Sequence, residues 1–282
     1  MIQENKNAYP LVSIIISTYN RKNLLKRAIT SAIKQDYPNI EIIISDDNSL
    51  DDNEEMIENI KKQTTIPIFY IKNKKNMGAC FTRNQGIKIA SGKYIAGLDD
   101  DDEFTPNRIS LLVKNYNPKY SLITSNSILI TKNKKYNLFK DKKAKIISFK
   151  DSLWENQVGT QCLVESERIR NCNGFDTNLT SAQDADMWIR LIQKYGNALR
   201  LPQVTYLIHT EHENNRISTS AKKITGLITY YKKHEPHMSS GQKSYMNFKI
   251  HYWKNKKITF KSLFLLTPSS IFHILSVFFK RK

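Results

Sequence analysis

Residues 11–18, LVSIIIST, form a continuous run of mostly β-branched apolar residues that ends in polar ones. Such a run is typical of a strand that is buried on both faces of a parallel sheet. Three similar runs follow, namely IEIIIS (40–45), IPIFYIK (66–72) and KYIAGL (93–98). Between them lie three segments with helical spacing of apolar residues, at 19–35, 54–63 and 80–91. This alternation predicts an α/β fold with an open, mostly parallel sheet of the doubly wound type and flanking helices.

Polar side chains follow three of these predicted strands. The first strand ends in Ser17, Thr18 and Tyr19, the second in DDNS (46–49), and the fourth in DDDDE (99–103). Ligands of such sheets bind at the carboxyl ends of the strands, so we expect these side chains to line one site. Because several carboxylates at one edge repel each other, the arrangement favours a site that binds a cation or hydrogen-bonding ligands.

The acidic run of residues 99–102 is a candidate metal site. Mg²⁺ and Mn²⁺ prefer oxygen ligands and are usually held by one or two carboxylates together with substrate phosphates. Asp99 and Asp101, two residues apart at a strand end, suit one such cation. The alternative is a solvated acidic turn in which Asp102 caps the helix that follows. Zinc is disfavoured because no HxxxH motif or cysteine cluster lies nearby.

Two common nucleotide-binding motifs are missing from the sequence. It contains neither GxGxxG nor GxxxxGK[ST], so dinucleotide binding and P-loop hydrolysis lose their main support. After residue 106 the pattern is looser. We expect strands at 122–131 and 201–210, a helix at 184–196, a solvated loop or hairpin at 132–145, and a polar loop at 211–219.

The net charge of +18 is concentrated near the C-terminus, since residues 222–282 contain 13 Lys and Arg and one acidic residue. A basic segment of this kind implies an anionic partner, either nucleic acid or a membrane surface. Residues 262–279, SLFLLTPSSIFHILSVFF, lack formal charge but are short for a membrane span and contain Pro268. We interpret them as an interfacial amphipathic segment; the alternative is a C-terminal helix that closes the core.

The three cysteines, Cys80, Cys162 and Cys172, are too few for a disulfide framework. We expect reduced thiols in a cytoplasmic protein, although Cys162 and Cys172 could form a bridge. The polar N-terminal segment, MIQENKNAYP, has no apolar core of a signal peptide.

Four motifs together carry a family resemblance: VSIIISTYNR, IIISDDNSLDD, NMGACFTRNQGIKIASGKYIAGLDDDDEFTP and QDADMWIRL. In this order they resemble the bacterial family 2 inverting glycosyltransferases with the GT-A fold, over about residues 10–216. The resemblance implies a GT-A domain at 1–216, with a nucleotide-sugar half at 10–105 and an acceptor half at 106–216. A basic, helical C-terminal extension would occupy 217–282.

The resemblance also implies a donor site for a UDP-sugar. Ser17, Thr18 and Tyr19 would border the nucleotide, and Asp47 would accept a hydrogen bond from the uracil N3–H, with Asp46 close by. Both could instead be ordinary turn aspartates. Arg83 would face the nucleotide or its diphosphate, where its planar guanidinium suits phosphate oxygens; the alternative is an arginine on a solvated helix face.

Asp99, Asp100 and Asp101 match the DxD motif of the family. Asp101 would bind Mn²⁺ or Mg²⁺, and Asp99 would contact the ribose, or the metal through water. Because the residue between them, Asp100, is also an aspartate, it stays open which of residues 99–102 bind the metal. Asp102 is a supporting candidate.

Asp184 of QDADMW matches the position of the catalytic base, which takes the proton of the attacking acceptor hydroxyl. The alternatives are that Asp184 caps a helix and that Asp186 is the base. We expect Trp188 to lie in the core. His209 and His212 follow the last strand, where family members fold over the donor, and either is a candidate for contact with phosphate or metal.

The resemblance therefore implies an inverting, metal-dependent hexosyltransferase, and the basic, amphipathic tail suggests that it acts at the cytoplasmic face of the cell membrane. Its acceptor would be a glycan or an undecaprenyl-diphosphate-linked sugar in O-antigen, capsule or lipooligosaccharide synthesis, and no nucleic acid would be involved. Two other hypotheses stay open at this point. One is a nucleic-acid-binding protein that uses the basic tail, and the other is an inactive sugar-binding relative.

Overall fold

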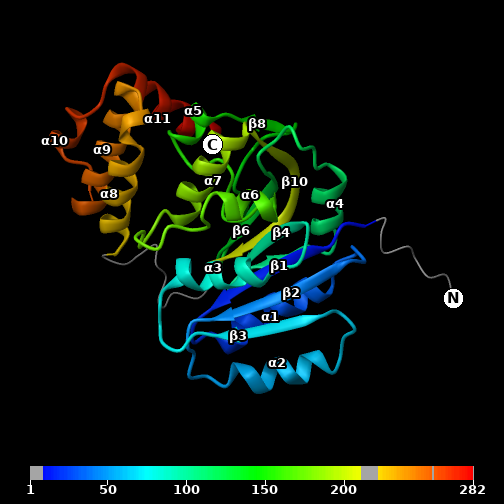
Figure 1. The fold of residues 1–282 in the computed structure, drawn as a ribbon. Coiled ribbons are helices and arrows are strands. Elements are labelled where there is room, and N and C mark those ends of the chain that lie inside the picture. Colours follow the sequence, from blue (N-terminus) through cyan, green and yellow to red (C-terminus); the bar gives the residue numbers. More distant parts are fainter. Residues whose placement is uncertain (1–8, 211–221, 256, 282) are drawn as a thin grey trace.

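The fold is a mixed α/β architecture in a computed structural model that describes residues 9–210, 222–255 and 257–281 (Figure 1). The strands are β1 (Val12–Thr18), β2 (Ile40–Asp46), β3 (Ile68–Lys72), β4 (Tyr94–Asp99), β5 (Glu103–Phe104), β6 (Ile123–Ile130), β7 (Lys135–Asn137), β8 (Lys145–Ile147), β9 (Leu163–Glu165) and β10 (Ala198–His209). The helices are α1 (Lys22–Ile33), α2 (Asn53–Lys61), α3 (Ala79–Ile89), α4 (Arg108–Lys114), α5 (Phe149–Ser152), α6 (Ser166–Asn171), α7 (Gln183–Tyr195), α8 (Lys222–His234), η3 (Glu235–His237), α9 (Ser240–Asn255), α10 (Phe260–Leu263) and α11 (Pro268–Arg281).

The described strands form one sheet whose main path runs β3-β2-β1-β4-β9-β6-β10-β5. β1 is parallel to β2 on one side and to β4 on the other. Their register places Thr18 beside Asp46, and Ser17 beside Asp99. The carboxyl ends of three predicted strands therefore meet at one edge. The chain order reverses between β1 and β4, and such a reversal is where open α/β sheets bind their ligands.

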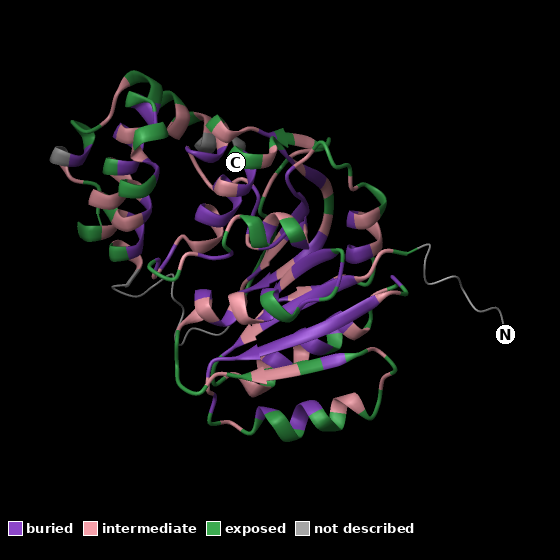
Figure 2. Ribbon diagram, viewed as in Figure 1, coloured by how far each residue is buried: buried purple, intermediate pink, exposed green. Residues whose placement is uncertain are grey.

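The continuous apolar run of β1 is explained by cores on both faces of the sheet. Ile14 and Ile16 belong to the core on the side of α1, α2 and α4, whereas Ile15 belongs to the core shared with α3, α6 and α7. Figure 2 shows the central strands buried and the outer helix faces exposed. Complete burial of one such isoleucine side chain stabilises the fold by about 1.5–3 kcal/mol.

The second half of the sheet is less regular than the first. The strands expected at 122–131 and 201–210 are confirmed as β6 and β10, although β10 begins earlier, at Ala198. The segment 132–145 contains β7, which forms an antiparallel pair with β6, and leads into β8, which pairs with β10. The expected polar loop at 211–219 and its His212 lie outside the described residues.

The C-terminal helices pack onto α7. A third core contains Ile189 of α7, Leu227 and Tyr230 of α8, and Met246 of α9. In Figure 1 helices α8 to α11, coloured orange to red, lie together beside α7. In the part of the chain that the structure describes, every helix is too short or too polar to traverse a bilayer.

Candidate active site

The end of β4 places Asp99 between two polar side chains. Its Oδ1 accepts hydrogen bonds from Gln161 Nε2 at 2.8 Å and from Arg83 Nη2 at 3.1 Å. Arg83 also donates to Gln183 Oε1 at 2.9 Å, so it connects β4 to the first residue of α7. Burial raises the pKa of Asp99, and the charge of Arg83 opposes that rise. Arg83 therefore faces residues 99–102, which we call the acidic turn, and not open solvent.

Gln161 reaches Asp99 because residue 97 is a glycine. A Cβ atom on Gly97 would lie 1.9 Å from Gln161 Oε1, closer than any real contact. The glycine of the run KYIAGL is thus needed for the close approach of the Gln161 side chain to β4.

Asp100 and Asp101 share Arg21, which follows β1. Arg21 Nη1 lies 3.0 Å from Asp100 Oδ1 and 3.3 Å from Asp101 Oδ2. Asp100 also accepts a hydrogen bond from Thr18 Oγ1 at 2.8 Å. Burial raises the pKa of Asp100 to about 6 against the opposing charge of Arg21. The aspartates that the sequence places in a row are thus partly neutralised by arginines from α3 and from the β1–α1 turn.

Asp102 is turned into the protein. It is buried, and its Oδ1 accepts a hydrogen bond from the backbone N–H of His209 at 3.0 Å. Burial, with the charges of Asp99 and Asp101 adding to it, raises the pKa of Asp102 well above its ordinary value. The interpretation of Asp102 as a helix cap is wrong, because Asn107 occupies the N-cap of α4. The His209 imidazole Nε2 lies 2.8 Å from Glu103 Oε1, at the same end of the sheet.

Asp46 holds the loop between β2 and α2. Its carboxylate is buried and accepts hydrogen bonds from Ser49 N–H (2.7 Å), Asn53 Nδ2 (2.8 Å) and the Tyr70 hydroxyl (2.9 Å). Asp47 holds the segment before α3. It accepts from Met77 N–H (2.7 Å), Gly78 N–H (2.8 Å) and Asn73 Nδ2 (2.8 Å). Both aspartates shape the predicted nucleotide edge, while contact of Asp47 with a base stays a prediction.

The remaining predicted donor-site residues lie at the end of β1. Ser17 is partly exposed and neighbours Asp99 in the register, Thr18 is buried, and Tyr19 is 44% exposed. Asn20 follows with φ of 52°, a left-handed conformation that asparagine tolerates better than most residues. Its Oδ1 accepts a hydrogen bond from Leu50 N–H at 2.8 Å, which fixes the β1 and β2 loops to each other.

The acidic turn fits a divalent cation whose coordination is completed by phosphate. The side chains of Asp99 and Asp101 are 21% and 14% exposed, so both carboxylates stay accessible from outside. Among the described residues there is no group of three His, Cys, Asp or Glu side chains that could hold a metal alone. One or two carboxylates plus phosphate oxygens is the ordinary arrangement for Mg²⁺ in nucleotide sites. Asp101 and Asp99 are the residues that would hold it.

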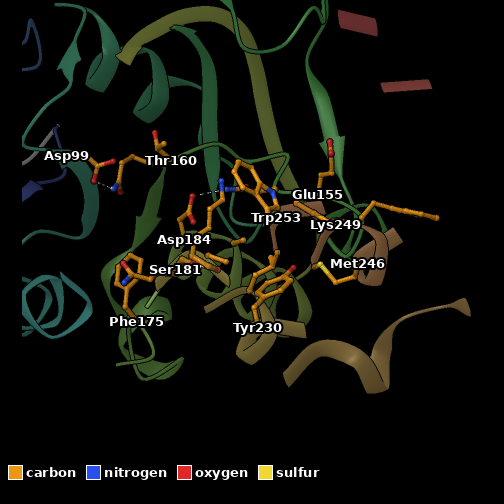
Figure 3. A pocket seen from close by; sticks show the side chains of 18 of the residues that line it. Asp99, Glu155, Thr160, Phe175, Ser181, Asp184, Tyr230, Met246, Lys249 and Trp253 are labelled. Atoms are coloured by element: carbon orange, nitrogen blue, oxygen red, sulfur yellow. Dashed lines mark hydrogen bonds between the residues drawn. The ribbon is translucent and has the colours of Figure 1, made fainter. Parts of the chain in front are cut away.

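A cavity of about 440 Å³ joins the acidic turn to α7 and to the C-terminal helices (Figure 3). Asp99, Arg83 and Gln161 lie at the sheet side, and Asp184 lies in the wall from α7. In Figure 3, Asp99 and Lys249 lie on opposite sides of Asp184. The cavity is within the 300–1,000 Å³ typical of small-ligand sites.

Asp184 has the surroundings of a general base. Its Oδ2 accepts a hydrogen bond from Asn156 Nδ2 at 2.9 Å, which orients the carboxylate. Burial raises its pKa to about 6; the backbone N–H of Ala185 opposes this and the charge of Asp99 adds to it. A carboxylate with a raised pKa accepts protons better than an ordinary aspartate does. Asp184 is not the helix cap, because Ala182 occupies the N-cap of α7 and makes no side-chain cap hydrogen bond.

Asp186, the rival base, has a different role. It is fully buried and lies within 2.9 Å of Arg190, Lys233 and His234. Burial alone raises its pKa, but the hydrogen bond from His234 and the charges of Arg190 and Lys233 lower it to about 2. Asp186 therefore connects α7 to α8. The expectation for Trp188 is confirmed, since it is buried in the core and its Nε1 donates to Gly159 O at 3.0 Å.

Residues of α8 and α9 that the sequence analysis assigned only to a basic tail also line this cavity. They are Lys223, Leu227, Tyr230, Met246, Lys249 and Trp253. Helical spacing in the sequence places residues 223, 227 and 230 on one face of α8. It likewise places residues 246, 249 and 253 on one face of α9. Composition alone could not show which face these helices turn toward Asp184.

Comparisons with known proteins identify the family of the chain. The family described as Glycosyl transferase family 2 matches residues 13–164. A protein named as the glycosyl transferase WcaA of colanic acid biosynthesis, from Escherichia coli strain K12, is 34% identical over 264 residues, which cover 91% of this chain and 93% of the relative. The GalNAc(5)-diNAcBac-PP-undecaprenol β-1,3-glucosyltransferase of Campylobacter jejuni is 30% identical over 191 residues, covering 66% of this chain and 60% of the relative.

Solved structures share the fold at low sequence identity. The crystal structure of Staphylococcus aureus TarS 1–349 in complex with UDP-GlcNAc has a TM-score of 0.69 at 15% identity, covering 86% of this chain and 72% of that one. The mannosyltransferase PcManGT from Pyrobaculum calidifontis, in complex with GDP-Man and Mn²⁺, has a TM-score of 0.64 at 14% identity. The match covers 82% of this chain and 66% of that one. These likenesses concern the fold alone.

Proposed function

The chain belongs to glycosyl transferase family 2, and we propose that it is an inverting, metal-dependent hexosyltransferase. The donor is a UDP-linked hexose or N-acetylhexosamine. The acceptor is a hydroxyl of a glycan or of an undecaprenyl-diphosphate-linked sugar in bacterial surface polysaccharide synthesis. The observation that carries the proposal is that Asp99 of the acidic turn and Asp184 of α7 line one cavity.

The expectations for family and fold are confirmed. The family match covers the strands that create the site, and the structural neighbours are GT-A glycosyltransferases. The residue roles, the metal and the donor go beyond these findings and are part of the proposal.

In the proposed reaction, Asp184 takes the proton of the acceptor hydroxyl while that oxygen bonds to the anomeric carbon of the donor. The bond from this carbon to the diphosphate oxygen breaks in the same step, and UDP leaves. A single displacement inverts the anomeric configuration and needs no covalent enzyme intermediate. Asn156 keeps the Asp184 carboxylate oriented, since it donates to Oδ2.

The residues at the strand ends bind and orient the donor in this proposal. Arg83 pairs with Asp99, and Arg21 pairs with Asp100 and Asp101, so the two arginines partly offset the negative charge of the three carboxylates. A bound Mn²⁺ or Mg²⁺ supplies positive charge that stabilises the leaving diphosphate. The carboxylates of Asp99 and Asp101 are the groups in this chain that would hold that ion.

The membrane location rests on the C-terminal helices. Apolar side chains of α10, α11 and the turn after α10 are exposed: Leu263 (50%), Phe264 (77%), Ile271 (45%), Phe272 (75%) and Leu275 (48%). Lys254 and Lys257 are exposed nearby in the chain. Apolar side chains beside lysines suit the interface of an anionic membrane. The proposal therefore assigns this basic region to the cytoplasmic membrane face and not to nucleic acid.

A thermal-shift screen of nucleotide sugars, with and without Mn²⁺, tests the donor assignment. A ligand that binds only the folded state raises the unfolding temperature. We expect at least one UDP-sugar to do so in the presence of Mn²⁺, and Asp101→Ala to remove the Mn²⁺-dependent part of the shift. Asp176→Ala is the control, since Asp176 pairs with Lys233 and does not line the cavity. Absence of a shift with every nucleotide sugar would overturn the donor assignment.

A further inference from the structure

Gln183, the first residue of α7, holds Arg83 in place at the cavity wall. Its Oε1 accepts a hydrogen bond from Arg83 Nη1 at 2.9 Å, and its Nε2 donates to the backbone oxygen of Leu179 at 3.0 Å. An amide has one accepting end and one donating end, so these two bonds fit a single orientation of the side chain. Gln183 and Arg83 both line the cavity that contains Asp184.

The Arg83 guanidinium is held by groups from three parts of the chain. Its Nη2 lies 3.1 Å from Asp99 Oδ1 at the end of β4, and its Nη1 donates to Gln183. Its Cζ lies over the Phe175 ring, 5.4 Å from the ring centroid. The Arg83 side chain is 20% exposed, so part of it stays accessible beside the cavity. A planar guanidinium fixed in this way suits phosphate oxygens.

Among the described residues, the two hydrogen-bond partners of the Arg83 guanidinium differ in charge. Asp99 is a carboxylate, whereas Gln183 is a neutral amide that binds the guanidinium without neutralising it. In the proposed donor complex the Asp99 carboxylate also faces the cation, so its negative charge is shared between that cation and Arg83. The neutral partner therefore matters for how much positive charge Arg83 presents to a diphosphate.

We propose that Gln183 is a positioning residue for the donor: it holds Arg83 toward the diphosphate and, because it is an amide, leaves the positive charge of that arginine available to the phosphate oxygens. This inference rests on the proposed function, because it takes the donor diphosphate to lie beside Asp99. It assigns a role to the residue that precedes the proposed base. A carboxylate at position 183 should therefore weaken donor binding.

Two variants of similar side-chain size separate the effect of charge from that of packing. Gln183→Glu keeps an acceptor for Arg83 and adds a negative charge, whereas Gln183→Met removes the acceptor and adds no charge. Neither side chain can donate to the Leu179 oxygen, so the loss of that bond is common to both variants. Glutamate is favourable in the first turn of a helix, so we expect Gln183→Glu to fold.

The measurement is the dissociation constant of UDP in the presence of Mg²⁺, obtained with the full chain by isothermal titration calorimetry. We expect it to rise about threefold in Gln183→Met, from the lost hydrogen bond to Arg83. In Gln183→Glu it should rise about thirtyfold, because the added charge pairs with Arg83 and repels the diphosphate. A merely structural role of Gln183 would give the two variants equal losses of affinity.

Gln193→Glu is the matched control. It makes the same substitution on the same helix, at an exposed position outside the cavity lining, and should bind UDP as wild type does. Circular dichroism melting confirms that each variant is folded.

The proposal is overturned if Gln183→Glu binds UDP as tightly as Gln183→Met does, or more tightly. Its failure is distinguishable from failure of the proposed function, which wild type alone reports. If wild type binds UDP and the two variants at position 183 are alike, only the role of Gln183 is contradicted. If wild type does not bind UDP, the donor assignment fails, and this inference fails with it.

Discussion

Asp184 and Asp186 are two residues apart on α7 and have opposite surroundings. Burial beside Asn156 raises the pKa of Asp184 to about 6, whereas His234, Arg190 and Lys233 lower that of Asp186 to about 2. The surroundings of Asp184 suit a group that must accept a proton near neutral pH. The surroundings of Asp186 instead hold it in a permanent ion pair. The structure therefore gives different surroundings to the two carboxylates that the sequence offered as alternative candidates for the catalytic base.

Replacement of Asp184 by Asn should remove proton acceptance and keep the shape of the site. We expect kcat to fall by about 10²- to 10⁴-fold, the range for loss of a general base. The dissociation constant of the UDP-sugar with Mn²⁺ should stay unchanged. The measurement is UDP release with and without acceptor, with Asp176→Asn as control. A kcat within twofold of wild type would exclude Asp184 as the base.

The same carboxylate predicts a pH profile. The raised pKa means that Asp184 is protonated below about pH 6 and ionised above it. In the wild type, kcat/KM should therefore rise with pH through about 6 and level off, since only the ionised form accepts a proton. A profile that is flat from pH 4.5 to 8 would contradict this assignment.

Strand β4 positions the acidic turn through a tight contact with Gln161. In Gly97→Ala the new methyl group displaces the Gln161 side chain, so its 2.8 Å hydrogen bond to Asp99 is lost. The free energy of unfolding should fall by only about 1 kcal/mol, the contribution of one hydrogen bond, because a flexible side-chain end moves. Binding of UDP with Mn²⁺ should weaken as well.

The double variant Gly97→Ala/Gln161→Ala separates the two effects. If the contact is the cause, the unfolding energy of the double variant equals that of Gln161→Ala alone, as a double-mutant cycle measures. Additive losses would show that the methyl group disturbs something other than Gln161.

Helices α7 and α8 are joined through Asp186. Asp186→Asn leaves Arg190 and Lys233 without their buried anion, and we expect a loss of about 3 kcal/mol at pH 7. Because the folded-state pKa is lowered, the ionised group contributes stability above about pH 4, its unfolded value, and that contribution fades as pH falls toward 2. Urea unfolding measures the free energy of unfolding of wild type and of Asp186→Asn at pH 7 and at pH 3. The difference between the two proteins should be smaller at pH 3. An equal difference at both would contradict the ion-pair account.

The first four strands could be predicted from the sequence because each is a long apolar run that ends in polar residues. Other elements could not, for physical reasons. β5 and β9 have two and three residues, too few to show a period. The role of Gln161 was not predictable either, because it depends on β9 lying next to β4 in the sheet. Arg83 and Asp99 were identified as site residues, but their 3.1 Å pairing needed the fold.

The whole chain combines a sheet-edge site with an exposed apolar surface on its C-terminal helices, which we propose contacts the membrane. α11 has two faces that suit this: His273 stacks on Trp154 at 4.4 Å beside the cavity wall, while Ile271, Phe272 and Leu275 are exposed. The proposed membrane contact and the cavity wall are therefore connected through packed residues of α11, since His273 also packs edge-on against Tyr245 of α9.

Cosedimentation with vesicles that contain 30% phosphatidylglycerol tests the membrane surface. We expect wild type to bind. Phe264→Ser and Phe272→Ser should each lower the partition coefficient by about tenfold, because each removes an aromatic side chain that would be buried in the membrane interface. Phe69→Ser is the control, since Phe69 is 46% exposed on β3, away from the C-terminal helices. Equal binding of all four proteins would contradict a role for this apolar surface.

A crystal structure of the chain with UDP and Mn²⁺ tests whether the acidic turn holds the metal and the diphosphate. We expect an anomalous difference peak for manganese at about 2.2 Å from a carboxylate oxygen of Asp101 and from a diphosphate oxygen of UDP, a distance typical of hard-cation coordination. The diphosphate should lie at the carboxyl ends of β1 and β4, facing the cavity that contains Asp184. A manganese peak remote from residues 99–101, or UDP bound at another surface, would contradict it.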